Sequence, residues 1–399
     1  MFTPAPRILK RYADVLIKFA LNNGKGIKRD DVVYIVTQVP GIPLAKEVYS
    51  SVLERGGHAL INIIDDDFKL ISIEKSSKKQ LQFFPEKYYR GLVDTVDHWV
   101  RILADKDPMY LKNSDPKKVI LSSKANRKFR EWLDKKEDEG KFCWTLCLYG
   151  TEGNAKEAGL STQQYWNQIT KACFLNERDP LKKWRSIHSG IESTIKKLNS
   201  LPIDRLHVQS VDTDLWLKVG EKRKWLGGSG HNIPSFEIFT SPDWRGTEGK
   251  IYFDLPLYRY GNIIKDIRLE FKNGKVIKAT AAKNEKLLKE MIKQKNADKI
   301  GEFSLTDSRF SRISKFMADT LYDENFGGRY GNTHLAVGKS YHDAYDGDAA
   351  KLSEEEFEAI GFNHSPEHTD IISTVDRTVT AVMHDGSEKV IYRKGKFTL

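Results

Sequence analysis

The spacing of apolar residues changes about halfway along the chain, and this change limits the folds that the chain can adopt. Up to about residue 175, apolar runs of strand length alternate with helical patterns, an order typical of βαβ units and a parallel sheet. Beyond residue 200, short segments that alternate apolar and polar residues follow one another. A chain of 399 residues also exceeds what one hydrophobic core usually serves. We therefore predict two domains, an α/β N-terminal domain with a parallel sheet over residues 1–185 and a mostly antiparallel β (α+β) C-terminal domain over residues 186–399.

The first half begins with a helical stripe over residues 7–21. A βαβ unit follows, made of the strand VVYIVTQV, the helix LAKEVYSSVLERGG and the strand HALINII. No glycine-rich phosphate loop comes after the first strand, so this half carries no nucleotide-binding signature. Further along, the patterns predict strands at VILSS and FCWTLCLYG and helices over residues 86–103, 126–136, 161–172 and 179–199.

The second half is predicted to consist mainly of hairpin-linked strands. RLHVQSV, IIKDIRLEF, KVIKATAA, TVTAVMH and KVIYRKG have strand length and composition. The turn dipeptides in FKNGKV and HDGSEKV are typical of tight hairpins. Inserted helices are expected over residues 284–296 and 308–321.

The formal charge of +10, from 65 basic and 55 acidic residues, raises the question of an anionic partner. The lysines and arginines occur in short groups separated by Asp and Glu, without a single long basic stretch. We interpret them as a solvated surface and predict no nucleic-acid partner.

No apolar run approaches the roughly 18 residues that a membrane helix needs. The apolar stretch near the N-terminus is broken by Arg11, Asp14 and Lys18, which a signal peptide would not contain. Of the three cysteines, Cys143 and Cys147 would share one face of a strand, but no second pair completes a zinc site. These features predict buried structural thiols, a cytoplasmic location and no membrane partner.

Acids and histidines recur in four stretches of the second half. LYDENFGGRYGNTHLAVGKSY places Asp323, Glu324, His334 and Tyr341 around a glycine-rich turn. The other stretches are NIPSFEIFTSP with Glu237, IGEFSL with Glu302, and FNHSPEHTD with His368 and Asp370. Six of the ten histidines lie in the last 170 residues, beside these acids. We interpret the four stretches as one dinuclear metal site.

Taken singly, each stretch also has an ordinary explanation. Glu237 resembles a surface acid on an edge strand, and FNHSPEHTD resembles a polar loop. On an extended segment, however, His368 and Asp370 would point to the same side. Asp323 and Glu324 are expected at the C-terminus of the helix over residues 308–321, where acids oppose the helix dipole and favour a nearby cation. That cation would be a lysine or a metal ion.

With these motifs in order, the second half resembles the aminopeptidase T and aminopeptidase S family of dinuclear metallo-aminopeptidases, the thermophilic metalloprotease type. The resemblance is carried by six motifs, NIPSFEIFTSP, GKIYFDLPL, IGEFSL, LYDEN, THLAVGKSY and GFNHSPEHTD. The first half resembles the family's α/β domain more weakly, in YADVLIKFALNNGKGIKRDDVVYIV and the LAKEVY helix. Together these segments cover nearly the whole chain.

The resemblance implies specific roles for these side chains. It implies two divalent metal ions bound by Glu237, Glu302, His334, His368 and Asp370, with Glu324 as a further acidic member and Tyr341 as a catalytic phenol. Glu237 and Glu302 are both candidates for the catalytic base and for the bridging ligand.

Two departures from the family pattern stand beside these roles. Phe236 occupies a position where the family often has a second acid. FGGRYGNT also separates Glu324 from His334 by more residues than in the simplest members.

The residue types agree with this chemistry, because an oxygen-rich site with imidazoles and no thiolate suits Zn, Mn or Co. We therefore expect a homodimeric aminopeptidase that acts on peptides with a free N-terminus. One alternative is a related metallohydrolase that cleaves another amide, such as an N-acyl amino acid. The other is a basic nucleic-acid-binding protein without catalytic activity.

Overall fold

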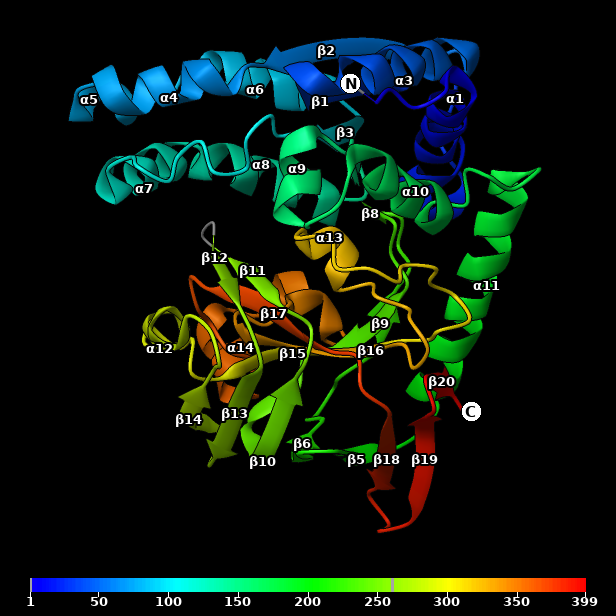
Figure 1. Ribbon diagram of the computed structural model, residues 1–399, viewed down its shortest axis with the longest axis vertical. Coiled ribbons are helices and arrows are strands. Elements are labelled where there is room, and N and C mark those ends of the chain that lie inside the picture. The colour runs from blue at the N-terminus through cyan, green and yellow to red at the C-terminus, as the bar shows by residue number, and fades with distance from the viewer. Residues whose placement is uncertain (1, 260–261) are drawn as a thin grey trace. The chain divides into compact units, whose positions relative to one another are not determined.

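The structure is a computed structural model that describes residues 2–259 and 262–399 (Figure 1). Its contacts divide the chain into two compact units. One comprises Met1–Arg185 with Ser229–Pro234, and the other comprises Ser186–Gly228 with Ser235–Leu399. The predicted fold class is confirmed, because the first unit contains a parallel sheet with helices and the second contains antiparallel sheets.

The first unit is built on a parallel sheet with strand order β2-β1-β3-β4-β8. The strands are β1 (Val32–Gln38), β2 (His58–Ile64), β3 (His98–Leu103), β4 (Cys143–Leu148) and β8 (Asn232–Ile233). In β1 every residue from Val33 to Gln38 is buried, as is typical of a parallel strand covered on both faces. The short strand β8 comes from much later in the sequence and pairs with the edge of β4.

Helices α3 (Ile42–Glu54), α6 (Glu86–Thr95) and α8 (Arg127–Asp138) pack on this sheet. The last two cover Tyr34 and Val36 of β1 with an aromatic and aliphatic cluster that includes Val93, Phe129 and Leu133. α11 (Pro180–Asn199) contains the point in the sequence at which the first unit ends and the second begins. The remaining helical segments of the first unit are α1 (Pro6–Val15) with a π-helical continuation (Leu16–Ala20), α2 (Leu21–Gly24), α4 (Asp66–Lys75), α5 (Lys78–Leu81), α7 (Pro116–Ala125), α9 (Glu152–Glu157) and α10 (Thr162–Ala172).

Two sequence predictions in the first unit are wrong. The helix predicted over residues 86–103 ends at Thr95, and its second part is the central strand β3. An alternating burial pattern in β3 follows the period of a strand, which a helical reading of the segment missed. VILSS, predicted as a strand, belongs to α7, because Asp115 caps a helix that starts with Pro116.

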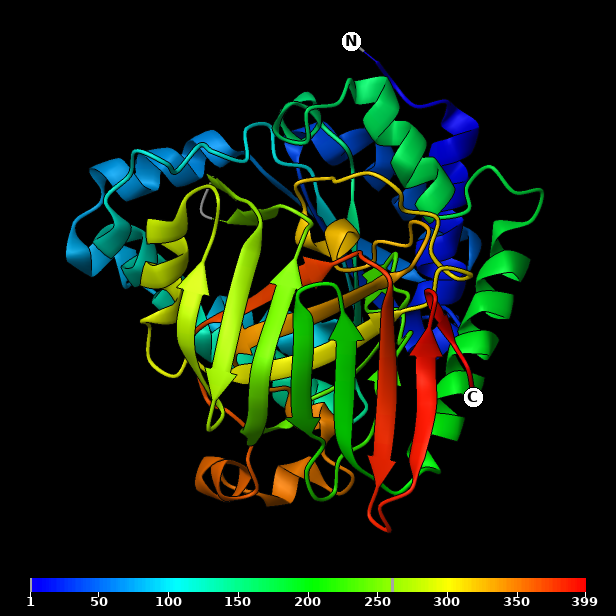
Figure 2. The same ribbon diagram turned by 60° about the horizontal axis from the view of Figure 1, so that its bottom comes forward.

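The second unit contains two large antiparallel sheets, which are seen one behind the other with crossing strands in Figure 2, and the separate pair β11-β12. The larger has the order β14-β13-β10-β6-β5-β18-β19-β20 and the smaller β17-β16-β15-β9-β7. The larger sheet comprises β5 (Ile203–Ser210), β6 (Thr213–Lys218), β10 (Asp243–Phe253), β13 (Ile267–Lys272), β14 (Lys275–Thr280), β18 (Arg377–Met383), β19 (Glu388–Arg393) and β20 (Lys396–Phe397). The smaller comprises β7 (Leu226–Gly227), β9 (Glu237–Thr240), β15 (Ile300–Thr306), β16 (Asn332–Gly338) and β17 (His368–Ser373).

The predicted hairpins of the larger sheet are confirmed. β13 and β14 are joined by Asn273 and Gly274, both with positive φ, and β18 and β19 are joined through Gly386. The other elements are the β11–β12 hairpin (Leu257–Arg259 and Asn262–Ile264), α12 (Glu285–Ile292), α13 (Thr320–Asp323), α14 (Glu354–Ala359) and two 3₁₀ turns (His342–Ala344 and Ala349–Lys351).

The helix predicted over residues 308–321 is wrong, because only Thr320–Asp323 is helical. The preceding residues form a loop that is held by Asp323. Its carboxylate accepts hydrogen bonds from the backbone N–H of Met317 at 2.7 Å and of Asp319 at 3.1 Å. Asp323 therefore has a structural role in this loop, whereas the helix-dipole argument predicts a nearby cation for it.

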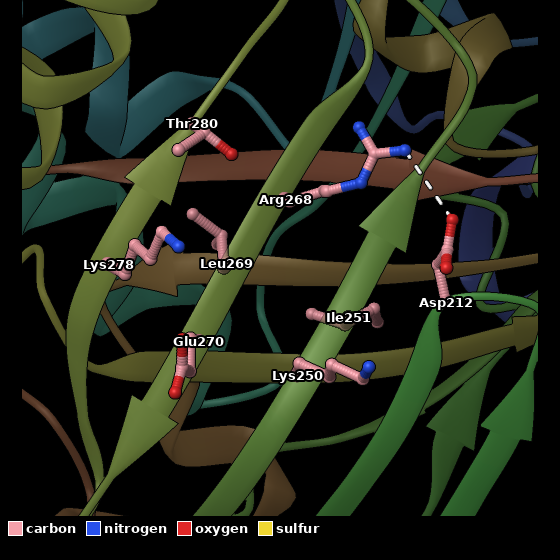
Figure 3. Close-up of a pocket in the computed structure, with 8 residues that line it drawn as sticks. All are labelled: Asp212, Lys250, Ile251, Arg268, Leu269, Glu270, Lys278 and Thr280. Atoms are coloured by element: carbon pink, nitrogen blue, oxygen red, sulfur yellow. Dashed lines mark hydrogen bonds and ion pairs between the residues drawn. The ribbon is translucent and has the colours of Figure 1, made fainter.

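The outward face of the larger sheet is charged. Along β13 buried and exposed residues alternate, as expected for a sheet with one solvated face. Lys250, Arg268, Glu270 and Lys278 surround a shallow hollow of about 260 Å³ there, and Arg268 pairs with Asp212 at 3.5 Å (Figure 3). None of the acids and histidines singled out from the sequence lines this hollow.

Within the described residues, no helix has the length and apolar character required to cross a lipid bilayer.

Candidate metal centre

The smaller sheet of the second unit has one apolar face and one polar face, and both are buried. On β15, Phe303 and Leu305 alternate with Glu302, Ser304 and Thr306, and each of these residues is buried. The same alternation on β16 puts His334 on the polar face. A fully buried row of polar side chains is costly unless the side chains bind one another or a ligand.

Strand register brings the predicted ligands together on this polar face. Ser304 of β15 pairs with His334 of β16, and Ala336 of β16 lies between Glu302 and Asp370. His368 is two residues before Asp370 on β17, so the two side chains share a face, as predicted. Glu237 reaches the same face from β9.

Gly301 makes this arrangement possible at the start of β15. The register between β15 and β16 shifts between Ile300 and Glu302. A Cβ atom on Gly301 would lie 2.1 Å from the carbonyl oxygen of Lys339, so only glycine allows this close approach.

The side chains form two groups of potential ligands that share Glu302. Glu237, Glu302 and His334 form one group, and Glu302, His368 and Asp370 form the other, with the ligand atoms of each group within 4.8 Å of one another. His334 Nε2 lies 3.0 Å from Glu302 and 3.3 Å from Glu237. His368 Nε2 lies 3.4 Å from Asp370 and 3.7 Å from Glu302.

Both histidines are oriented by backbone carbonyl groups. His334 Nδ1 is 3.2 Å from the carbonyl oxygen of Glu324, and His368 Nδ1 is 2.8 Å from that of Lys339. When Nδ1–H donates to a carbonyl group, Nε2 carries the lone pair in the neutral ring. This arrangement is the usual one for histidines that bind metal ions.

Glu324 lies beside these two groups without belonging to either. It directly follows α13 and is buried. Its carboxylate accepts a hydrogen bond from Asn325 Nδ2 at 3.3 Å. Burial and the charges of Glu237, Asp370 and Glu302 raise its pKa well above the usual value, so it faces the other acids closely enough to be repelled.

The pKa values of the cluster show that it is short of positive charge. Burial, together with Glu302 and Asp370, raises the pKa of Glu237 to about 8, although His334 opposes this shift. Burial would lower the pKa of His334, but its hydrogen bond to Glu302 and the charges of Asp370, Glu302 and Glu237 raise it to about 9. Each of these shifts adds protons to a cluster of mutually repelling carboxylates.

The donor set fits divalent metal ions. Four carboxylates and two imidazoles with no thiolate suit Zn, Mn or Co, and an ion would offset the repulsion described above. The Ser304 hydroxyl and the Asn332 amide oxygen are also buried, with no hydrogen-bond partner among the described residues. They lie on the polar face, where a ligand or water is required to satisfy them.

Tyr341 lies at the edge of the cluster. Its ring is 4.7 Å from the ring of His368, between centroids, and its backbone N–H donates to Ser241 Oγ at 2.9 Å. Although 41% of the residue is exposed, burial and then the charges of Glu302 and Asp370 raise the pKa of its phenol above the usual value. The phenol therefore stays protonated at neutral pH and can donate a hydrogen bond.

The sequence patterns missed two supporting residues. Asn325 Oδ1 accepts the backbone N–H of Phe236 at 2.5 Å and so ties the segment before Glu237 to the residue after Glu324. Arg259 pairs with the buried Glu367 at 2.5 Å. Burial would raise the pKa of Asp370, but His368, His334 and then Arg259 lower it to about 2. Asn325 was visible in the LYDEN motif, whereas no pattern marked Arg259.

Comparisons with known proteins agree with this donor set. A family model described as thermophilic metalloprotease (M29) matches residues 6–397. The chain is 27% identical over 411 residues to aminopeptidase AmpS of Bacillus subtilis, with 98% of each chain covered. It is 30% identical over 366 residues to aminopeptidase PepS of Streptococcus thermophilus, which covers 87% of this chain and 84% of that relative.

The fold is also similar to a solved structure. Wild-type AmpT from Thermus thermophilus matches with a TM-score of 0.84 at 22% identity, over 98% of this chain and 99% of that one. The resemblance predicted from the motifs is confirmed. Because the family model spans nearly the whole sequence, this chain belongs to the thermophilic metalloprotease (M29) family and is an enzyme of the metalloprotease class.

Proposed function

We propose that the chain is an aminopeptidase that binds two divalent metal ions and releases N-terminal residues from peptides. The observation that carries this proposal is the pair of ligand groups that share Glu302. A carboxylate common to two sites is what a pair of neighbouring cations requires. The two groups and the family membership support the same conclusion independently.

Each side chain has a role in this proposal. Glu302 would be shared by the two ions, Glu237 and His334 would hold one of them, and His368 and Asp370 would hold the other. Glu324 is a further acidic member beside them. When bound, the ions supply Lewis acidity, which polarises a peptide carbonyl group and acidifies a water molecule.

The protein's own groups move the protons and stabilise charge. The shared position of Glu302 leaves Glu237 as the acceptor of the proton from the attacking water. Tyr341 donates a hydrogen bond to the carbonyl oxygen as negative charge develops on it. The free amine of a peptide's first residue would serve as a further ligand for one of the ions, which favours removal of the first residue over cleavage within a chain.

Hydrolysis of peptides is better supported for this site than either of the two alternative functions. The relatives AmpS and PepS are both named aminopeptidases, which favours a peptide substrate over an N-acyl amino acid. No observation on the described surface favours a non-catalytic protein that binds nucleic acid.

The homodimer and the cytoplasmic location belong to the same proposal. All three cysteines are free, which suits a reducing compartment. Sedimentation of the intact chain distinguishes a dimer from the 45.8 kDa monomer, and a monomer at working concentration would contradict that part of the proposal.

Removal of metal ions is expected to abolish hydrolysis of aminoacyl chromogenic substrates, and Zn, Mn or Co is expected to restore it. N-acetylated forms of the same substrates should remain uncleaved, because they lack a free amine. The measurement is the initial rate of chelator-treated protein with each ion and each substrate pair. Cleavage confined to the acetylated series would favour the N-acyl alternative, and indifference to chelator would contradict metal dependence.

Glu302→Gln is expected to lower bound metal and to reduce kcat/KM at least about 100-fold, since even groups that only support metal ligands typically contribute 10- to 100-fold. The matched control is Glu270→Gln, an acid-to-amide change in the hollow of Figure 3, which should leave both quantities unchanged. Metal content is measured by elemental analysis after dialysis. Full metal content and full activity in Glu302→Gln would refute the shared-ligand role.

Tyr341→Phe is expected to lower kcat by about 10² to 10³, the usual effect of losing one donor to a developing oxyanion. Bound metal should be unchanged, because the phenol is assigned to the substrate and not to the ions. Tyr88→Phe, at an exposed position in the first unit, serves as the control. A Tyr341→Phe enzyme with a wild-type kcat would remove the phenol from the mechanism.

A further inference from the structure

A second cluster of titratable side chains lies in the first unit, around Cys143. His98 on β3 is the register partner of Cys143 on β4, so both side chains leave the parallel sheet on the same side. His231 immediately precedes β8, which pairs with the other edge of β4. The side chains of His98 and His231 both lie within hydrogen-bonding range of the Cys143 thiol, so the sulfur has an imidazole from each neighbouring segment.

Each of these imidazoles is held by a carboxylate on its far nitrogen. His98 Nε2 lies 2.8 Å from Asp31, and His231 Nε2 lies 3.0 Å from Glu137. The His231 ring also stacks on Trp144, with centroids 4.4 Å apart. The carboxylates favour the charged form of both rings and leave each Nδ1 free to face the thiol.

The buried Nδ1 atom of His98 gives this cluster a specific polar group that needs a partner. The His98 side chain is only 5% exposed, and its Nδ1 has no conventional hydrogen-bond partner among the described residues. It neighbours the Cys143 sulfur, which helps to raise the pKa of His98 against the effect of burial. A buried polar atom directed at a thiol is satisfied best when that thiol is a thiolate.

The surroundings of the sulfur agree with this form. The backbone N–H of Asn22 donates to Cys143 Sγ at 3.4 Å. Burial would raise the pKa of the thiol, but His231, His98 and this N–H lower it to about 6. Burial would likewise lower the pKa of His231, but Cys143 and Glu137 raise it to about 9. At neutral pH these shifts favour a thiolate beside the His231 imidazolium, with His98 on the other side of the sulfur and Asp31 and Glu137 behind the two rings.

The other two cysteines provide a contrast within the same chain. Cys147 and Cys173 are fully buried, as expected of structural thiols, whereas Cys143 is only partly buried. Burial raises the pKa of Cys147 well above the usual value. The His231 side chain is 33% exposed, so the Cys143 cluster borders the solvent on that side.

We propose that Cys143, with His98 and His231, is a modification site at which the thiolate reacts with peroxides to give a sulfenic acid. The sulfur attacks one peroxide oxygen and the O–O bond breaks. A proton from the His231 imidazolium converts the leaving hydroxide into water, so a neutral imidazole and a sulfenic acid remain. Thiols react with a sulfenic acid and reduce it back to the cysteine thiol, so the modification can be removed.

A metal site at the same residues is disfavoured by their geometry. Within the described part of the chain, the groups with three ligand atoms inside 4.8 Å of one another are the two that share Glu302. The Cys143 cluster is not among them, because its imidazoles flank the sulfur from opposite neighbouring strands. Two imidazole N–H groups on either side of the sulfur can donate hydrogen bonds to a thiolate, whereas a metal ion requires ligand atoms that converge on one point.

The test measures iodoacetamide alkylation of each cysteine in the intact, metal-loaded protein as a function of pH, with fragmentation mass spectrometry to separate Cys143 from Cys147. Cys143 should react with a midpoint near pH 6, while Cys147 and Cys173 stay unreactive until the protein unfolds. The midpoint is the quantity to compare. A thiol with a higher pKa gives a more nucleophilic thiolate but a smaller thiolate fraction, so the two effects partly cancel in a rate measured at one pH.

Removal of an imidazolium is expected to move this midpoint upward by one pH unit or more. His231→Gln is the principal variant, because that side chain is partly exposed and its loss should not prevent folding. His98→Gln is the second. The matched control is His207→Gln, since His207 also pairs with a carboxylate, Asp214 at 2.6 Å, and stacks on Trp216, but lies far from any cysteine in sequence and in the other unit.

Treatment with hydrogen peroxide followed by dimedone should label Cys143 selectively, and less in His231→Gln at pH 6. A Cys143 midpoint above pH 8, or equal midpoints in wild type and both histidine variants, would overturn the proposal. Protection of Cys143 by added Zn²⁺ that is lost in His98→Gln would assign the cluster to a metal ion and overturn it as well. These readouts are masses of peptides, so they do not depend on the proposed peptidase activity.

Discussion

The second unit depends on one electrostatic constraint, the concentration of carboxylates on the buried face of a sheet. Two like charges about 4 Å apart repel by about 4 kcal/mol at an effective dielectric constant of about 20. Glu237, Glu302, Glu324 and Asp370 face one another with only two imidazoles between them. Strands hold Glu237, Glu302 and Asp370 in place, and Glu324 is held at the end of α13, where a flexible loop would let the charges separate. The repulsion is therefore built into the backbone, and cations are the natural means of offsetting it.

The surrounding structure supports this constraint in specific ways. Gly301 allows the start of β15 to approach the backbone of Lys339 closely, and the small Ala336 lies between Glu302 and Asp370. Asn325 ties the segments that carry Glu237 and Glu324. Backbone carbonyl groups orient both histidine rings before any ion binds. Arg259 adds one fixed positive charge near Asp370. Preorganisation of this kind lowers the reorganisation required when a metal ion binds.

Much of this could be predicted from the sequence, because period and motif are local signals. The parallel and antiparallel halves, the two hairpins and the shared face of His368 and Asp370 follow from residue spacing. The failures are equally physical. The segment over residues 308–321 has helical spacing of apolar residues, yet the Asp323 carboxylate binds its backbone N–H groups and stabilises a loop. The sequence pattern does not separate β3 from α6, because only two residues lie between the end of α6 and the start of β3 and the apolar residues of both continue one another.

The two histidine clusters of this chain show why residue type alone does not determine chemistry. In both, carboxylates and carbonyl groups orient imidazoles, and burial opposes the charged form. On the antiparallel sheet, neighbouring strands direct several carboxylates and both Nε2 atoms toward common points, which suits cations. Around Cys143, the imidazoles approach a single sulfur from the two strands that flank it, which suits an anion. The sign of the stabilised charge therefore follows from which atoms the strand register brings to the centre, and neither composition nor spacing in the sequence contains that information.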